Sequence, residues 1–181
     1  MPTSVRTPAR TSDAPRGGTM TGEVAVRRPL VEVFAFVADM RNEPRYNRRM
    51  ASAEKVTPGP VGRGTRFHQR MRMPGRAAHM WSEITGYDPL RSLAVRAHLS
   101  WMDTSGALTF TPAEGGTRLS WDWDVRLHGR AAALAPALLV LGRRQEHATW
   151  RALARHLERQ NRWRRKGWRR QKRRWRSPAG Q

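Results

Sequence analysis

The chain has 181 residues, enough for one domain with a sizeable hydrophobic core. It carries 35 lysine or arginine residues against 14 aspartate or glutamate residues, a formal net charge of +21. It contains no cysteine, which excludes disulfide bonds and thiolate chemistry. Residues 159–181 hold eleven of the basic residues and no acidic one. Such a segment is attracted to nucleic acid, anionic lipid or an acidic partner.

The N-terminal residues 1–19 are rich in Pro, Ser, Thr, Gly and Arg and offer almost nothing to bury. We expect them to form a disordered extension. Met20 directly precedes the first strand-like residues, so it is a second candidate for the start of translation. Because the extension lacks the apolar run of a signal peptide, we expect a cytoplasmic protein, with peripheral attachment to a membrane as an open alternative.

The next elements are short. Residues 22–28 place two valines on one face and predict a strand. Pro29 suits the first turn of a helix, which the pattern predicts over residues 30–38. Residues 39–46 contain a proline and predict a break followed by a short helix or turn, and residues 51–57 fit another strand.

Alternation of apolar and polar residues then dominates from residue 65 to residue 127. Its clearest case is the segment 117–127, in which tryptophan, leucine and valine alternate with charged or small polar residues. A second face runs from Leu93 to Trp101. These strands follow one another as hairpins without intervening helices, which predicts an antiparallel sheet.

Residues 131–160 form the only long segment with helical patterning. Trp150, Leu153 and Leu157 recur at spacings of three and four, and Leu134, Leu138 and Leu141 do the same upstream. Pro136 predicts a late start or a kink. The uncharged run ends at residue 143, well short of the ~20 residues that a membrane span needs.

Five segments in this order resemble the polyketide cyclase/dehydrase-like proteins of the START-like (SRPBCC) superfamily. They are VAVRRPLVEVFAFVADMRNEPRYN (24–47), GPVGRGTRF (59–67), EITGYDPLRSLAVR (83–96), FTPAEGGTRLSWDWDV (110–125) and LGRRQEHATWRALARHLE (141–158). The resemblance covers residues 20–158. It implies an α+β helix-grip fold, in which a curved antiparallel sheet of six or seven strands wraps around a long C-terminal helix, with two short helices after strand 1. Tyr46 stands where the family usually has a tryptophan.

The resemblance also implies an elongated apolar cavity between the sheet and the long helix. Members of the family bind lipids, sterols, polyketides, quinones or plant hormones, and some catalyse cyclisation or dehydration. The family has no universal catalytic motif, so no catalytic residue carries over and catalysis stays open. We expect no cofactor.

Large side chains on the inner face of the predicted sheet are the candidate ligand-binding residues. Three tryptophans and two methionines are more than a tight small core needs, and bulky rings with few polar partners suit the wall of a cavity. A filled core is the alternative. Gln69 is the polar member, and it needs a partner if it is buried. The set is Phe67, Gln69, Met71, Met80, Trp101, Phe110, Trp121 and Trp123.

Other polar groups carry weaker signals. Asp122 and Asp124 form a carboxylate pair on one face of a strand, and an exposed ladder of ion pairs competes with acid–base chemistry as its role. The six histidines never fall into metal-binding spacing, and His79 and Glu83 lie ~13 Å apart on a strand. We expect no metal site. The glycines of residues 59–64 lie between two strands and fit turn chemistry better than a phosphate loop.

Three hypotheses on function follow. The first is a protein that binds or carries a small hydrophobic ligand such as a lipid, a polyketide or a quinone. The second is an enzyme of the aromatase/cyclase type that acts on a polyketide. The third is an interaction protein that docks on RNA, the ribosome or an anionic membrane through its basic tail, residues 159–181.

The tail has one feature beyond its charge. Trp150, Leu157, Trp168 and Trp175 are separated by nearly whole numbers of turns and share one face of a continuous helix. In water we expect fraying after about Arg162, and helix formation on anionic vesicles or RNA. The candidate contact residues are Trp163, Arg164, Arg165, Trp168, Arg169, Arg170, Arg173, Arg174 and Trp175.

Overall fold

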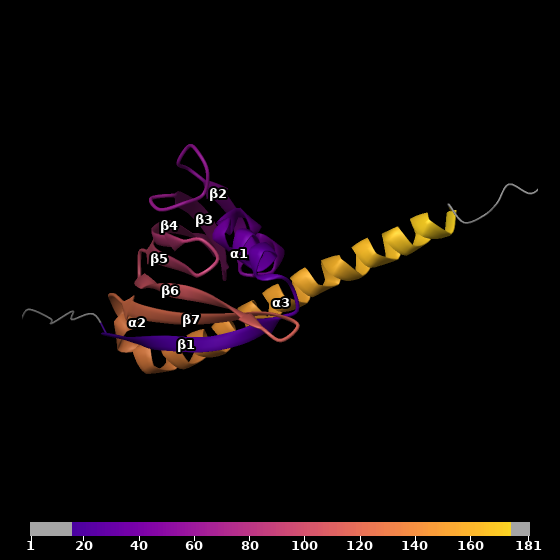
Figure 1. Cartoon of the computed structure of the whole chain (residues 1–181). Helices are drawn as coiled ribbons and strands as arrows, with labels where there is room; N and C mark the ends of the chain where they lie inside the picture. Colours follow the sequence, from indigo (N-terminus) through magenta and orange to yellow (C-terminus); the bar gives the residue numbers. More distant parts are fainter. Residues whose placement is uncertain (1–15, 175–181) are drawn as a thin grey trace, which may run out of the picture.

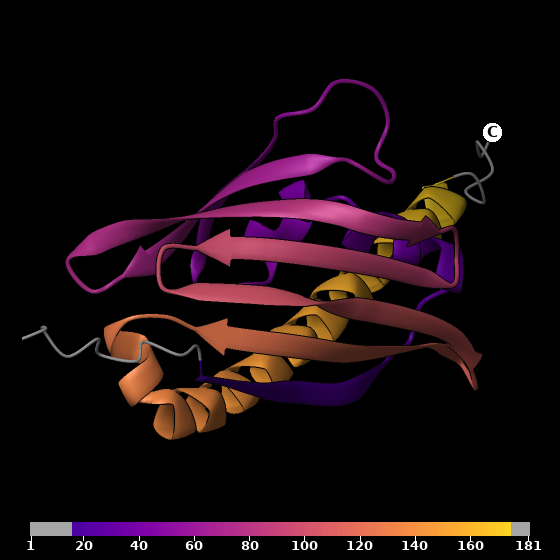
Figure 2. The ribbon, with the colours of Figure 1, turned by 90° about the vertical axis from the view of Figure 1, so that its left-hand side faces the viewer.

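The computed structural model describes residues 16–174, with side chains described up to residue 159 except for Arg76. Seven antiparallel strands form one curved sheet in the order β1-β7-β6-β5-β4-β3-β2 (Figures 1 and 2). From β3 to β7, each strand pairs with the next strand along the chain as a hairpin, as the alternation predicted. The strands are β1 (Arg16–Val26), β2 (Met50–Lys55), β3 (Arg66–Met73), β4 (Arg76–Asp88), β5 (Ser92–Leu99), β6 (Met102–Ala113) and β7 (Gly116–Leu127).

Two short helices connect β1 to β2, namely α1 (Leu30–Ala38) and the 3₁₀ helix η1 (Met40–Arg45). Pro29 lies directly before α1, where its missing N–H costs nothing. The Asp39 side chain accepts a hydrogen bond from the backbone N–H of Arg41 and caps η1. Phe34 of α1 meets Phe110 edge to face, with ring centroids 5.0 Å apart.

The long helix starts late, as Pro136 predicted. A short helix α2 (Arg130–Ala133) ends at Leu134, and α3 (Ala135–Arg174) then crosses the concave face of the sheet diagonally (Figure 2). Trp150, Leu153 and Leu157 are buried, which confirms the predicted stripe over residues 150–157. The expected α+β helix-grip fold is therefore confirmed. Within residues 16–174, no helix is long and apolar enough to span a membrane.

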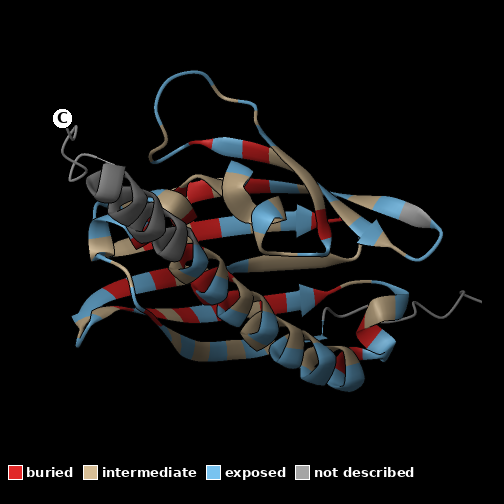
Figure 3. Cartoon of the chain, turned by 90° about the vertical axis from the view of Figure 1, so that its right-hand side faces the viewer, coloured by how far each residue is buried: buried red, intermediate tan, exposed pale blue. Residues whose placement is uncertain are grey.

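The segment 134–149, before Trp150, differs from the prediction. Leu134 and Leu141 are 61% and 57% exposed, so the upstream apolar stripe does not pack as a whole against the sheet. No described residue from 136 to 149 is buried (Figure 3). The helix stands away from part of the sheet here, which leaves room between the two layers.

Two element boundaries also differ. β1 begins at Arg16, so residues 16–19 belong to the sheet and not to the predicted N-terminal extension. The pattern missed them because glycine has low strand propensity, yet Gly17 lies against β7, where an added Cβ would stand 2.2 Å from the carbonyl oxygen of Val125. Trp101 lies in the turn between β5 and β6 and not on a strand. Residues 1–15 lie outside the described part.

The helix α3 continues beyond Arg162, where the sequence predicted fraying. It runs to Arg174 and projects past the edge of the sheet (Figure 1). Extending an existing helix costs far less than starting one, so the packed segment before residue 159 supports the turns that follow. Gly167 does not interrupt it.

Candidate ligand-binding cavity

A cavity of about 350 Å³ lies between the inner face of the sheet and the N-terminal half of α3. This volume falls within the range of ligand pockets, ~300–1,000 Å³. The seven strands of the sheet form one wall, α3 forms the opposite wall, and η1 with the following loop closes one side. Alternation along each strand places every second side chain on this face, so one cavity receives side chains from seven strands.

Methionine dominates the apolar lining. Seven of the eight methionines of the chain line the cavity, although they come from five strands and η1. Methionine side chains are flexible and polarizable, so they adapt to ligands of different shape. They are Met20, Met40, Met50, Met71, Met73, Met80 and Met102.

Five of the eight predicted binding residues line this cavity, namely Gln69, Met71, Met80, Trp101 and Trp123. Trp101 reaches the cavity from the turn between β5 and β6, so its role does not depend on the strand position that the sequence suggested.

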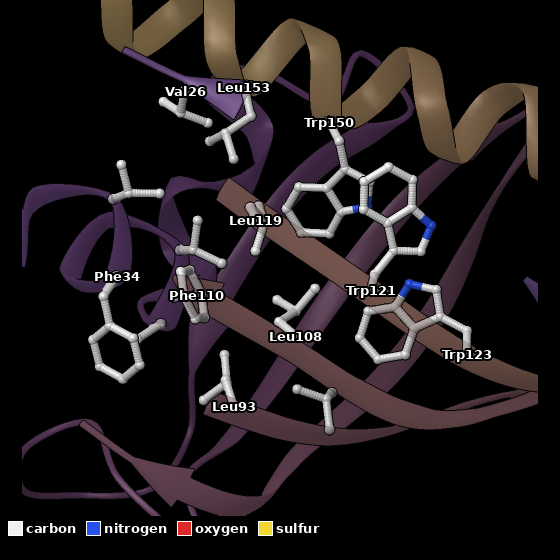
Figure 4. Packing of buried hydrophobic residues seen from close by; sticks show 14 of the residues in the cluster. Val26, Phe34, Leu93, Leu108, Phe110, Leu119, Trp121, Trp123, Trp150 and Leu153 are labelled. Atoms are coloured by element: carbon white, nitrogen blue, oxygen red, sulfur yellow. The ribbon is translucent and has the colours of Figure 1, made fainter. Parts of the chain in front are cut away.

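The other three predicted residues, Phe67, Phe110 and Trp121, do not line the cavity and are buried in the hydrophobic core. Phe110 packs against α1, and Trp121 stacks on Trp150 of α3 with ring centroids 5.8 Å apart (Figure 4). They share the inner face with the cavity residues but lie where helices cover the sheet closely.

Glu43, which the sequence analysis missed, is the first polar centre of the cavity. Its Oε1 accepts a hydrogen bond from Asn47 Nδ2 at 2.8 Å, and its Oε2 accepts one from Gln69 Nε2 at 2.6 Å. Gln69 Oε1 in turn accepts from the Ser82 hydroxyl at 2.5 Å. Gln69 is only 1% exposed, so it faces inward and has partners for both amide atoms, which confirms the predicted register of β3.

Glu146 of α3 is the second polar centre, and it was also missed. Its Oε1 accepts hydrogen bonds from the indole N–H groups of Trp123 and Trp150, at 2.9 and 2.8 Å. Tyr46 stacks on Trp150, with ring centroids 6.3 Å apart. Glu146 is therefore held by one tryptophan from β7 and one from its own helix, beside three aromatic rings.

Burial perturbs the acids of this site. It raises the pKa of Glu43 to about 7, against the opposing effect of its hydrogen bonds, and the charge of Glu146 adds to the rise. Burial likewise raises the pKa of Glu146, although both indole hydrogen bonds lower it. It also raises the pKa of Tyr46, which both carboxylates adjoin. Perturbed pKa values of this kind mark a candidate functional site.

The rim of the cavity carries a polar contact between two walls. Arg49, directly before β2, donates a hydrogen bond from its guanidinium to Gln145 Oε1 of α3. Both residues line the cavity, as do Leu138 and Leu141 of α3. Because Arg49 and Leu141 are exposed, this contact marks the side where the cavity meets solvent.

The polar groups on the outer face of the sheet stand apart from the cavity. Asp122 is exposed, and Asp124 pairs with Arg126 at 3.4 Å, as in an exposed ladder of ion pairs. His68 Nε2 lies 2.8 Å from His79 Nδ1. Among the described residues, no three His, Cys, Asp or Glu side chains converge as metal ligands do. The side chains of the nine tail residues lie outside the described part of the chain.

Known proteins share this architecture. A family model described as "Polyketide cyclase / dehydrase and lipid transport" matches residues 18–171. No curated protein matches the chain.

Among solved structures, the chain is similar to the Zhui aromatase/cyclase from Streptomyces sp. R1128, with 19% identity and a TM-score of 0.66 over 80% of this chain and 95% of that one. It is also similar to a START superfamily protein from Mycobacterium smegmatis, with 16% identity and a TM-score of 0.60 over 78% and 95% of the two chains. At these identities the structural likeness shows the fold alone. The family match spans most of the sequence, and the chain therefore belongs to the polyketide cyclase/dehydrase and lipid transport family.

Proposed function

We propose that this protein binds and carries a small, largely apolar molecule in the cavity between the sheet and α3. The observation that carries the proposal is a cavity of about 350 Å³ in which methionine, leucine and valine side chains surround two partnered carboxylates. Ligand sites of this size are mostly apolar with a few polar groups that fix orientation. The lipid-transport function in the description of the family supports the same role.

A cavity-filling substitution tests the proposal. Ala97 lies on the inner face of β5 between Ser82 and Thr104, and all three residues line the cavity. Ala97→Phe places a ring in the open space. An environment-sensitive hydrophobic dye should bind the wild type, and Ala97→Phe should weaken that binding about tenfold or more. The matched control is Ala25→Phe on the exposed face of β1, which should bind as the wild type does. Equal binding by Ala97→Phe and the wild type would contradict the proposal.

Catalysis on a carbonyl compound such as a polyketide is a second candidate, and one observation favours it. Glu43, with a pKa near 7, faces an apolar cavity and is fixed by Asn47 and Gln69. A general base is most effective when its pKa lies near the working pH. Deuterium exchange at the carbon between the carbonyls of an aromatic β-diketone, followed by NMR, tests this. We expect acceleration by the wild type and none by Glu43→Gln, and equal rates for both would remove the candidate.

The basic end of α3 supplies a separate proposal, attachment to an anionic membrane or to RNA. Its support is the continuous helix to Arg174, together with the eleven basic residues of segment 159–181. Arginines attract phosphates, while tryptophans at these positions suit a membrane interface or base stacking. If the basic end of α3 attaches to such a surface, the folded domain stays free to take up or release its ligand there.

A further inference from the structure

Hydrogen-bond donors of the cavity point at two acceptors, the carboxylates of Glu43 and Glu146. Asn47 and Gln69 donate to Glu43, and Trp123 and Trp150 donate to Glu146. These four donors are engaged by the carboxylates, while each carboxylate keeps further lone pairs for another partner. In their ionised form the two acids are therefore suited to a ligand that donates hydrogen bonds.

The charges point to a cation. Glu43 of η1 and Glu146 of α3 both line the cavity, and Tyr46, which follows η1, stacks on the Trp150 ring that donates to Glu146. The charge of Glu146 opposes ionisation of Glu43. A positive group between them relieves this repulsion. The rings of Tyr46, Trp123 and Trp150 also line this end of the cavity, and aromatic faces attract cations. Arg49, the arginine that lines the cavity, is bound to Gln145 at the rim.

We propose that the ligand is an apolar molecule with a protonated amine, which binds between Glu43 and Glu146 while its apolar part lies along the methionine wall. This inference rests on the proposed function, because it names the class of ligand for the same cavity. The ammonium donates to the free lone pairs of both carboxylates and leaves the four existing hydrogen bonds in place. An aliphatic carboxylate adds a third negative charge wherever Glu43 and Glu146 are ionised, so its binding there is disfavoured.

Three amphiphiles with one chain length test the preference of the full-length protein, namely dodecylamine, dodecanol and dodecanoate. Each is used below its micelle concentration, and isothermal titration at pH 7 gives its dissociation constant. We expect dodecylamine to bind about tenfold or more tighter than dodecanol, and dodecanoate to bind weakest. Dodecylamine should also displace a proton from Glu43, so its binding heat should change with the ionisation enthalpy of the buffer.

Glu146→Gln supplies the decisive variant, because Gln keeps an oxygen for both indoles while it removes the charge. It should weaken dodecylamine about tenfold and change dodecanol less than about twofold. Asp122→Asn removes the same charge from the exposed outer face and should change neither constant. Circular dichroism of each variant confirms that it is folded.

The outcomes separate the inference from the proposed function. If dodecanol or dodecanoate binds as tightly as dodecylamine, the cavity binds ligands but the amine preference is wrong. If Arg49→Gln then weakens dodecanoate, the polar end of the ligand sits at the rim and not between the acids. If none of the three binds and the hydrophobic dye does not bind either, the proposed function itself fails.

Discussion

The two ends of the interior are built from the same strands yet differ in packing. Along β6 and β7, Phe110 and Trp121 are buried against helices, whereas Leu108 and Trp123 line the cavity. The helix α3 changes in the same way, with Leu153 buried and Gln145 facing the open space. Strand alternation fixes which face is interior, but the distance between the layers decides whether that face is filled or hollow.

The largest expected difference between the packed end and the cavity end is the loss of stability when a tryptophan is removed, Trp121 at the packed end or Trp101 at the cavity. Trp121→Ala removes a buried ring from the packed end and should lower the free energy of unfolding by about 4 kcal/mol. Trp101→Ala, at the cavity, should cost about 1 kcal/mol or less but weaken dye binding. Urea unfolding and dye titration of both variants measure this. Similar stability losses in the two variants would show that the ends do not differ in packing.

The hollow end should also make stability depend on pH. Folded Glu43 keeps its proton up to about pH 7, while the unfolded side chain releases it near its ordinary pKa of 4.5. Between these values the folded state binds more protons, so stability falls as the pH rises, by about 3 kcal/mol in total.

Glu43→Gln isolates this effect, because it removes the titrating group and leaves the others. Urea unfolding at pH 4, 6 and 8 should show the wild type losing stability relative to Glu43→Gln as the pH increases. Parallel pH profiles for the two proteins would mean that Glu43 titrates normally in the folded state.

Gln69 links the sheet to η1 at the hollow end and should have a smaller effect. Gln69→Leu leaves the Ser82 hydroxyl without its acceptor and Glu43 without one donor, at a cost of about 2 kcal/mol. The fold should persist, while the selectivity for ligands changes. Unfolding and binding measured on one preparation check both parts. An unchanged ligand preference would exclude Gln69 as a polar anchor.

The end of α3 beyond the sheet should matter least for stability. A chain that ends at Glu158 keeps the hydrogen bond from the Arg27 N–H to Glu158 and should unfold within about 0.5 kcal/mol of the full chain. It should lose binding to anionic vesicles or single-stranded RNA, and binding by the full chain should weaken steeply with salt. If the shorter chain still binds vesicles or RNA, the tail is not the segment that binds them.

Local pattern was enough to predict the elements and their antiparallel pairing, and the resemblance to a family supplied the helix-grip architecture. Alternation in 117–127, the proline before α1 and the Trp150-Leu153-Leu157 stripe each indicate one element. The cavity was harder, because Phe110 and Trp123 have the same pattern and their difference depends on how far α3 lies from the sheet.

The two acids of the cavity show what further signal the sequence held. Glu146 lies four residues before Trp150, on the apolar stripe that continues to Leu153 and Leu157, and a carboxylate in such a stripe indicates a buried polar group. Glu43 has no such signal. It lies in a short 3₁₀ helix, and its partner Gln69 is 26 residues away in the sequence.

The central claim is that the hollow end holds a ligand, and native mass spectrometry of the protein purified from its own host tests it most directly. We expect the wild type to carry one apolar molecule per chain, and Ala97→Phe to be largely free of it. A wild-type protein that is free of ligand and also fails to bind a hydrophobic dye would contradict the account.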